Sequence, residues 1–451
     1  MEITLDKKSN TEGLIKIKLS LGDYQPHVEE KVKDYAKKAN IKGFRPGKVP
    51  SGVIKKMYGK SILVDEINHL LSHKLSDYIK DNNLKILGDP LPNHDKAQSI
   101  DWETQKDFEF EYQIGLVEDF QYELSSKAKV KSYPIEVDEK TIDETIDDLR
   151  KRFGKVNYPE TSEATDNLFG DLSQAEADFK REYSHISIDQ VSKKEQKKFL
   201  GLKKDDDVEF DIDKLFEDDK DGEKKAQLLG LSVDEAKEKK GKFTLKISTI
   251  SRTEPAELNT ELFDRVFGKD AVTDEEGFKT KVRETIGDNY KRESDHFLEH
   301  NIEDYFISNT KIDLPENFLK EWLKNSSEGK VTDSVLEEEF DSYKRGVVWD
   351  LIKNKIADDN KITVEADEVK GKAKELIVAQ FGGQAFAEQL QDRLDGIADN
   401  YLSHENGQNF MKLYHQLRNE KILTLIKENI TITEKKVSVD EFKKIVKEHT
   451  H

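Results

Sequence analysis

Apolar and polar residues alternate in two stretches near the beginning of the chain. Residues 14–19 (Leu-Ile-Lys-Ile-Lys-Leu) and 108–114 (Phe-Glu-Phe-Glu-Tyr-Gln-Ile) follow the two-residue period of strands that bury one face. Between them, residues 62–79 repeat apolar side chains every three or four positions, which predicts a helix. Pro90 and Pro92 predict turns after this helix. We therefore expect an antiparallel sheet with helices packed on one face.

A helix and a small β-rich domain are predicted in the middle of the chain. Residues 137–153 carry apolar side chains at helical spacing beside many carboxylates, which is typical of an amphipathic helix. Short alternating runs follow at 208–212 and 243–247, and charged loops separate them. These patterns predict a helix within residues 116–153, which we expect to pack with the carboxy-terminal body, and a β-rich domain over residues 154–252.

The last part of the chain is predicted to be helical. No proline follows Pro315, and apolar residues recur at intervals of three and four. Capping boxes are predicted at 273–276 (Thr-Asp-Glu-Glu) and 438–441 (Ser-Val-Asp-Glu), where a hydroxyl and a carboxylate would bind free amides at a helix start. The glycine pair at 382–383 predicts a turn between two antiparallel arms. We expect residues 253–451 to form an all-α body with helical arms.

Composition favours several domains with arms and crevices over one compact globule. Of the 451 residues, 35% are hydrophobic and 37% are charged, and the formal net charge is -19. The apolar share is below and the charged share above that of an average globular domain. The absence of cysteine excludes disulfides and thiolate metal sites. Neither a secretory signal nor a run of about 20 apolar residues is present, so we expect a soluble, cytoplasmic protein.

One stretch reverses the acidic balance of the chain. Residues 37–60 contain Lys and Arg but neither Asp nor Glu. Within it, residues 43–50 (Gly-Phe-Arg-Pro-Gly-Lys-Val-Pro) set an aromatic ring and two cations on a turn whose backbone two Pro and two Gly constrain. The local positive charge predicts a polyanionic partner. The alternative is a solvated basic turn with Phe44 folded back onto its own domain.

Residues 43–50 resemble the Gly-Phe-Arg-x-Gly-Lys-x-Pro signature of trigger factor, a bacterial chaperone family that docks on the ribosome beside the nascent-chain exit. The family often has a basic residue where Pro46 stands. Further stretches that resemble the family are 14–19, 32–40, 57–60, 107–115 and, at the carboxy terminus, 430–435 and 439–445. The ribosome-binding residues that the resemblance implies are Gly43, Phe44, Arg45, Pro46, Gly47 and Lys48.

The resemblance implies a multidomain α+β protein. Its parts would be an α+β ribosome-docking domain over residues 1–115, a linker over 116–153, a degenerate FKBP-like domain of the peptidyl-prolyl isomerase type over 154–252, and a helical chaperone domain over 253–451. Trigger factors lead us to expect an ATP-independent chaperone that binds nascent polypeptides at the tunnel exit of the large ribosomal subunit and delays their misfolding.

The resemblance also implies partners. The expected partners are ribosomal protein and RNA together with unfolded or nascent polypeptides. Binding to a membrane or to DNA is not expected. No cofactor and no metal are expected. A homodimer away from the ribosome stays open, as do two alternative functions: an active prolyl isomerase that assists folding, and a holdase or assembly scaffold that works without the ribosome.

Isomerase activity is left open because the pocket motif is not recognisable. Catalytic members usually carry a segment resembling I-P-G-F-E-x-G-L, whereas residues 191–202 here lack Pro-Gly-Phe and contain several lysines. Such a site needs an apolar, water-excluding pocket for the prolyl ring. Phe169, Tyr183 and Phe210 are the candidates to line it, and the alternative is that each belongs to the core of its domain.

Aromatic residues of the helical part are candidates for holding unfolded chains. Promiscuous binding requires several weak apolar contacts rather than one deep pocket. The alternative is that these side chains form the core between helices. The candidates are Phe318, Trp322, Trp349, Phe381 and Phe386, with Phe410 and Tyr414 beside them in the sequence pattern.

Two sequence patterns resemble metal sites but lack some of the required ligands. Residues 217–222 follow the start of an EF-hand loop, but Leu228 stands where a bidentate Glu belongs. His69 and His73 share a helix face, but no third ligand is evident. A solvated acidic loop and surface histidines are therefore expected instead.

Overall fold

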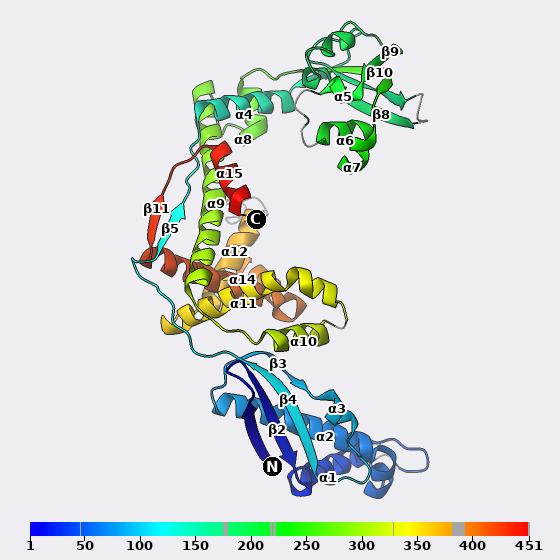
Figure 1. Ribbon diagram of the computed structural model, residues 1–451, viewed down its shortest axis with the longest axis vertical. Coiled ribbons are helices and arrows are strands. Elements are labelled where there is room, and N and C mark those ends of the chain that lie inside the picture. Colours follow the sequence, from blue (N-terminus) through cyan, green and yellow to red (C-terminus); the bar gives the residue numbers. More distant parts are fainter. Residues whose placement is uncertain are drawn as a thin grey trace. The chain divides into compact units, whose positions relative to one another are not determined.

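The computed structural model describes residues 1–449 apart from residues 46, 175–178, 217–218, 220–221, 328 and 381–392 (Figure 1). The chain divides into two compact units. The first comprises Met1–Ser132 and His296–Glu434, and the second comprises Tyr133–Asp295 and Lys435–His451. The segment expected to form one helical body, residues 253–451, is thus divided between the two units.

The amino-terminal domain of the first unit is a four-stranded antiparallel sheet with helices on one face (Figure 1). Tyr24 from the first helix and Ile67 and Leu71 from the second pack on Ile15 and Phe108 of the sheet, as the alternating pattern predicts. In sheet order the strands are β1 (Glu2–Lys7), β2 (Glu12–Leu19), β4 (Phe108–Leu116) and β3 (Ile86–Pro92), and the helices are α1 (Leu21–Lys38), α2 (Ser51–Asp81) and the short α3 (His94–Gln98).

The turns predicted at Pro90 and Pro92 are a strand instead. Both prolines lie in β3, which pairs with β4 and has no other partner strand in the sheet order. An edge strand tolerates proline because the missing N–H group would face away from the neighbouring strand. The register between β3 and β4 shifts between Leu87 and Leu91, so the pairing is interrupted at this point.

Apart from one short pair of strands, the rest of the first unit is helical, as the lack of proline after Pro315 predicts. Phe306, Trp349, Ile352 and Ile426 form the centre of one apolar cluster. The helices are the later part of α9 (Glu275–Asn309), α10 (Glu316–Ser326), α11 (Asp333–Asp359), α12 (Ala366–Gln380) and α14 (Leu394–Asn429). The last two pack on each other through their own apolar cluster, and the turn predicted at 382–383 between them lies outside the described residues.

A short parallel pair of strands joins two distant parts of the chain. β5 (Lys129–Ser132) pairs with β11 (Thr431–Glu434), and Thr431 aligns with Lys129. Neither strand is predicted from the sequence, and β11 is a short strand within residues 253–451, which are expected to be helical throughout.

Two glycines allow α10 to approach the amino-terminal sheet. A Cβ atom on Gly115 of β4 would lie 2.5 Å from Cδ1 of Phe318, and one on Gly88 of β3 would lie 2.9 Å from Cδ2 of Trp322. These separations are shorter than van der Waals contact allows. Glycine at both positions therefore leaves the space that the two aromatic rings occupy.

The β-rich domain of the second unit is a five-stranded sheet with short helices. Phe199, Phe210 and Phe243 are fully buried in its core. The sheet order is β6 (Lys155–Asn157), β10 (Lys242–Glu254), β7 (Asn167–Gln174) and β8 (Phe179–Ser187), and β9 (Asp207–Asp211) also pairs with β10. The helices are the 3₁₀ turns η1 (Ile188–Gln190) and η2 (Gln196–Phe199), with α5 (Ile212–Leu215), α6 (Glu223–Leu229) and α7 (Val233–Glu238).

The second unit also contains the predicted amphipathic helix. α4 (Glu139–Arg152) packs with α8 (Thr260–Phe267) and the beginning of α9 through Ile142, Ile146, Phe263 and Phe278. α15 (Val439–His449) begins at the predicted capping box, because the Glu441 amide donates to Ser438 Oγ (3.3 Å) and the Ser438 amide donates to Glu441 Oε2 (3.2 Å).

The other predicted capping box is not formed, because the cap is one residue later and Gly277, at the third helical position, has no side chain to complete it. Asp274, rather than Thr273, accepts the hydrogen bond from the amide of Gly277 at the start of α9 (2.8 Å). Asp and Thr are both suitable capping residues, so the sequence pattern does not distinguish the two registers. Within the described residues, no helix is long and apolar enough to span a membrane.

Candidate functional site

The basic turn connects α1 to α2, and both of its ends are anchored in an apolar cluster between these helices. Val49 is buried and Ile41 half-buried against Val32, Ala36 and Ile54. The intervening residues 42–48, hereafter the basic loop, are thus fixed at both ends by side chains that water excludes.

Local hydrogen bonds shape the backbone of the basic loop. The amide of Phe44 donates to the carbonyl of Ile41 (3.0 Å), and the amide of Lys48 donates to the carbonyl of Arg45 (2.9 Å). The second bond closes a four-residue turn, as the Pro-Gly sequence predicts. Pro46 itself lies outside the described residues.

Two glycines in the loop occupy backbone conformations that other residues adopt only with strain. Gly43 has a φ of +98° and Gly47 a φ of +75°. A Cβ atom on Gly47 would also lie 3.2 Å from the carbonyl oxygen of Lys37, near the end of α1. Glycine at position 47 therefore lets the loop lie directly against the end of the first helix.

The side chains of the loop face solvent. Phe44 is 38% exposed and belongs to neither apolar cluster of its domain, and Lys42, Arg45 and Lys48 are exposed. Within the described residues, these three cations form no ion pair. Elsewhere in the basic stretch, Lys37 pairs with Asp34 (3.0 Å), Lys55 with Glu29 (3.9 Å) and Lys60 with Glu103 (3.8 Å).

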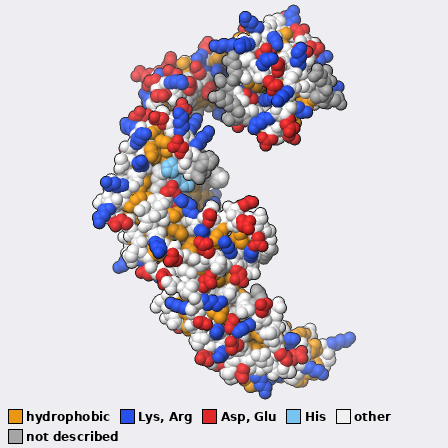
Figure 2. Space-filling view, in the orientation of Figure 1, with side chains coloured by type: hydrophobic (Ala, Val, Ile, Leu, Met, Phe, Trp, Pro, Cys, Tyr) orange, Lys and Arg blue, Asp and Glu red, His pale blue; other side chains and the backbone are white. Residues whose placement is uncertain are grey.

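The loop thus presents an aromatic ring and positive charges that its own domain does not neutralise. In Figure 2, Lys and Arg side chains project at the end of the amino-terminal domain that carries the α1–α2 connection. Such an arrangement can bind phosphates or carboxylates electrostatically and insert one ring into an apolar cleft.

The candidate pocket residues of the β-rich domain do not line one cleft. Phe210 lies in the core, where its ring centroid is 5.5 Å from that of Phe199. Phe169 follows the buried Leu168 on β7, so its side chain points to the opposite face of the sheet. Tyr183 is 81% exposed and lies beside a register shift between β7 and β8.

The face of the sheet that carries Phe169 holds a small polar cluster. The rings of Phe169 and His185 stack with centroids 4.9 Å apart, and burial lowers the pKa of His185 below its ordinary value, against an opposing effect of Asp189. Nε2 of His185 lies 3.0 Å from Oδ1 of Asn167, which also accepts a hydrogen bond from Ser187. The neighbours that hydrogen-bond here are an amide and a hydroxyl, neither of which is an activated nucleophile.

The lysines of residues 191–202 lie at the surface and not at the floor of a pocket. All four are exposed, and Lys198 pairs with Glu195 (2.6 Å). Phe199 of the same segment is fully buried in the core. The segment therefore contributes a core aromatic and a solvated basic edge.

An ion pair with a buried carboxylate holds the beginning of the β-rich domain to its last strand. Arg252 contacts Asp166 through two hydrogen bonds, Nε to Oδ1 (2.7 Å) and Nη2 to Oδ2 (2.9 Å), and the Asp166 side chain is fully buried. Burial raises the pKa of Asp166, but the hydrogen bonds from Arg252 and from the amide of Glu163 outweigh it and hold the pKa below its ordinary value. This pair serves stability.

Two of the aromatic candidates in the helical part belong to its core. Phe318 is 4% and Trp349 8% exposed. Trp322 is half-buried against Gly88, and Phe410 and Tyr414 are half-buried beside α12. Phe381 and Phe386 lie outside the described residues.

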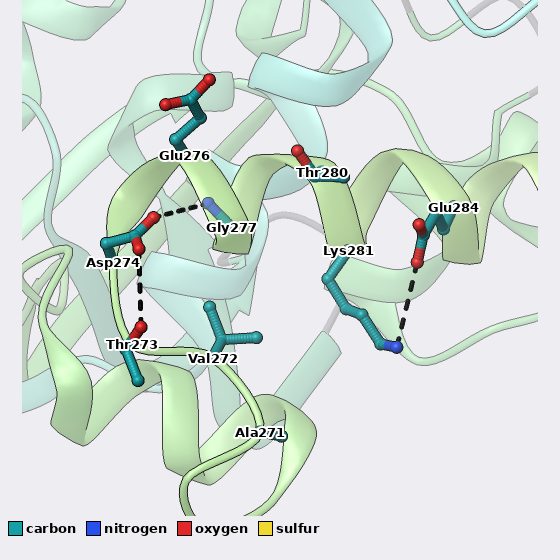
Figure 3. A pocket seen from close by; sticks show the side chains of 9 residues that line it. All are labelled: Ala271, Val272, Thr273, Asp274, Glu276, Gly277, Thr280, Lys281 and Glu284. Carbon is teal, nitrogen blue, oxygen red and sulfur yellow. Dashed lines mark hydrogen bonds and ion pairs between the residues drawn. The ribbon is translucent and has the colours of Figure 1, made fainter.

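A cavity of about 490 Å³ lies at the beginning of α9 (Figure 3). Several of the polar side chains around it bind one another: Thr273 contacts Asp274 (3.4 Å), Asp274 caps Gly277, and Lys281 pairs with Glu284 (3.8 Å). Glu276 and Thr280 also line the cavity, and Figure 3 shows their side chains apart from one another.

Neither imitation of a metal site is completed. Asp219 accepts hydrogen bonds from the amides of Lys224 and Lys225 and so caps α6, and Leu228 is buried in the core. Glu217 and Asp221 lie outside the described residues. Within the described part of the chain, no group of three or more His, Asp or Glu side chains could hold a metal ion.

Three exposed residues beside the basic loop were not predicted. Tyr35 of α1 and Met57 and Tyr58 of α2 are 45%, 54% and 37% exposed. Each lies on a helix whose apolar pattern also serves the core, so periodicity alone does not single it out. The signal that could have found them is their position within or next to the basic stretch 37–60.

Three family models match the chain in sequence order. They describe the bacterial trigger factor protein over residues 1–149, the probable trigger factor FKBP-like domain over 156–255, and the probable trigger factor C-terminal domain over 294–446.

Individual relatives match over the full length. The trigger factor of Pelagibacter ubique is 25% identical over all of this chain and 90% of its own length. That of Francisella tularensis subsp. holarctica is 23% identical over all of this chain and 98% of its own length. A solved structure concerning promiscuous substrate recognition by the trigger factor chaperone covers 95% of this chain and 100% of its own, with 17% identity and a TM-score of 0.44.

Proposed function

Because this chain belongs to the trigger factor family of ribosome-associated chaperones, we propose that the basic loop docks it on the large ribosomal subunit at the tunnel exit. There it binds nascent polypeptides in the cytoplasm and delays their misfolding without ATP. The observation that carries the proposal is the exposure of Phe44 together with Arg45 and Lys48, which pair with no carboxylate that the structure describes, on an anchored turn.

The geometry of the loop supports docking because little order remains to be gained on binding. Ile41 and Val49 fix its ends, and the amide of Lys48 already closes the turn onto Arg45. A preorganised loop loses less conformational entropy on binding than a mobile one. Its cations would approach phosphates of ribosomal RNA or carboxylates of ribosomal protein, which makes the affinity salt-dependent.

The remaining charge of the chain supports a restricted contact. With a formal net charge of -19, most of the surface repels RNA, and this favours an electrostatic contact through the basic stretch 37–60, which contains neither Asp nor Glu. This arrangement orients the chaperone on the ribosome while the acidic remainder stays free.

Chaperone action in this proposal is passive. Docking raises the concentration of the chaperone near each emerging chain, as any tethered binding site does. Transient burial of apolar segments then lowers the population of aggregation-prone species. With Phe318 and Trp349 in the core, the contacts to unfolded chains fall to partly exposed side chains such as Trp322, Phe410 and Met411.

Cosedimentation with ribosomes tests the docking. We expect the double variant Phe44→Ala/Arg45→Ala to lose salt-sensitive binding to ribosomes, since both the apolar and the electrostatic contact are removed. The control is Leu21→Ala/Lys74→Ala, which removes an equally exposed apolar residue and a cation from other parts of α1 and α2. Binding by the Phe44/Arg45 variant at the wild-type level would contradict the proposal and favour a holdase or assembly scaffold that works away from ribosomes.

A further inference from the structure

A second exposed aromatic surface lies beside the basic loop, on the helices that carry it. The rings of Tyr35 and Tyr58 have centroids 5.4 Å apart and an interplanar angle of 44°. Both side chains are substantially exposed, and Met57 next to Tyr58 is 54% exposed. Exposed apolar side chains that gather on one surface mark interaction sites more often than isolated ones do.

This pair is not part of the core between the helices. The apolar cluster there is made by Val32, Ala36, Val49, Ile54 and Ile62 without either tyrosine. Among the residues that the structure describes, neither tyrosine hydroxyl has a hydrogen-bond partner. Packing within the domain therefore does not account for two exposed rings held against each other.

The surface is continuous with the basic loop. Tyr35 lies two residues before Lys37, whose carbonyl oxygen approaches Gly47 of the loop. Lys38, one helical turn after Tyr35, is exposed and forms no ion pair with a described residue. A partner that covers the loop would therefore also reach the end of α1.

Three carboxylates near the pair in sequence, Asp34, Glu29 and Glu66, each form an ion pair. Asp34 accepts a hydrogen bond from Lys37, which lowers its pKa, and Lys55 pairs with Glu29 (3.9 Å). Lys31 likewise pairs with Glu66 (3.2 Å). Within five positions of either tyrosine, Glu30 forms no ion pair with a described residue, and neither do Lys33, Lys38 and Lys56. The charge left without a partner there is therefore positive, and this favours a polyanion as the occupant.

We infer that Tyr35 and Tyr58 stack on an unpaired base of RNA while Lys38 and Lys42 contact the adjoining phosphates. Aromatic rings next to unpaired cations are the combination with which proteins bind single-stranded RNA, since every base offers a face for stacking. The inference rests on the proposed function and deepens it by naming RNA as the partner of this second surface.

Titration of the full chain with 70S ribosomes over a range of KCl concentrations tests the inference. Three double variants are compared with the wild type: Tyr35→Phe/Tyr58→Phe, Tyr35→Leu/Tyr58→Leu and Tyr35→Ala/Tyr58→Ala. Stacking of one base gives an expected loss of about tenfold in affinity for the Leu and Ala variants. The Phe variant keeps its ring and is expected to bind within about twofold of the wild type. Since no cation is removed, the salt dependence is expected to be unchanged in all three.

Each other outcome overturns the inference. If the Leu variant bound ribosomes as tightly as the Phe variant, the contact would be an apolar one with protein instead of a base. Wild-type affinity of the Ala variant would show that the surface makes no contact. Zero-length ultraviolet crosslinking of the wild type to ribosomes adds a direct readout, with a crosslink between RNA and Tyr35 or Tyr58 expected and crosslinks to protein alone contradicting it. Failure of the docking proposal is distinguishable, because it would appear as ribosome binding retained by Phe44→Ala/Arg45→Ala.

Discussion

The basic loop and the β-rich domain use aromatic residues in opposite ways. In the loop, Phe44 follows a glycine with positive φ and precedes a closed turn, so its ring is left in solvent although apolar residues anchor both flanks. In the β-rich domain, Phe210 lies at an inward position of an alternating strand and is buried. The aromatic ring on the constrained turn is thus exposed, whereas the one in the alternating strand belongs to the core.

The largest difference between the two regions should appear in stability. We expect Phe210→Ala to lower the free energy of unfolding of the β-rich domain by about 3–5 kcal/mol, because it leaves a cavity among Phe199 and its other neighbours. Phe44→Ala should change stability by less than about 0.5 kcal/mol. Urea unfolding followed by hydrogen exchange of β9, β10 and α1 in the full chain measures both. Comparable destabilisation by the two variants would remove the contrast.

A smaller loss is expected when the ion pair of the β-rich domain is broken. Asp166→Asn should destabilise the domain by about 2 kcal/mol at neutral pH, less than a fully buried pair would lose, because Arg252 is 23% exposed and also contacts Glu163. The control is Asp171→Asn, an exposed carboxylate on β7, which should change little.

The same variant has a defined pH dependence. The pKa of Asp166 is lowered in the folded state, so its contribution is present above the pKa of an unfolded Asp, about 4. It is lost as the pH falls through the folded pKa, where the carboxylate is protonated. The free energies of unfolding of wild type and Asp166→Asn should therefore converge below about pH 4. A difference that persisted at lower pH would show that the charge is not what stabilises the domain.

Much of the fold follows from periodicity because the longest elements bury one continuous face. β2, β4, α2 and α4 were predicted from alternating or helical patterns and are confirmed. β3 was missed because proline is a turn signal unless the strand is known to lie at an edge. The pairing of β5 with β11 was missed because the two segments are far apart in sequence and each is short.

The candidate sites were predictable to different degrees, because some of their features are local in sequence and others depend on which elements pack together. The basic loop combines local charge with local backbone constraints, and both can be read from consecutive residues. Phe318 and Trp322 lie one helical turn apart on α10, yet one is fully enclosed and the other is half-buried on Gly88. Their exposure depends on which element packs against the helix, and the sequence of the helix does not contain that information.

Single substitutions in the basic loop separate its two kinds of contact. Arg45→Ala should lower the slope of log affinity for ribosomes against log salt by about one, because one phosphate or carboxylate contact is lost. Phe44→Ala should weaken binding about tenfold at every salt concentration and leave the slope unchanged, because it removes an apolar contact. Titration across KCl concentrations measures both values. Equal slopes for Arg45→Ala and wild type would contradict a direct ionic contact.

The smallest expected effect comes from the backbone that holds the loop. Gly47→Ala would force a side chain into a φ of +75° and bring its Cβ to 3.2 Å from the Lys37 carbonyl oxygen. The strain amounts to about 1 kcal/mol and corresponds to a roughly fivefold weaker affinity for ribosomes if the loop relaxes away from its docking shape.

Two matched glycines sharpen this last test. Gly43 also has a positive φ, but a Cβ there would meet nothing within 4 Å, so Gly43→Ala reports strain without the contact to α1. Gly52 lies within α2 with equally open surroundings, and Gly52→Ala should leave binding unchanged because alanine favours the helix. The affinity for ribosomes is therefore expected to be highest for Gly52→Ala, lower for Gly43→Ala and lowest for Gly47→Ala. Wild-type affinity of Gly47→Ala would mean that the exposed side chains bind without the preorganised turn. The backbone conformation of the loop would then contribute nothing to docking.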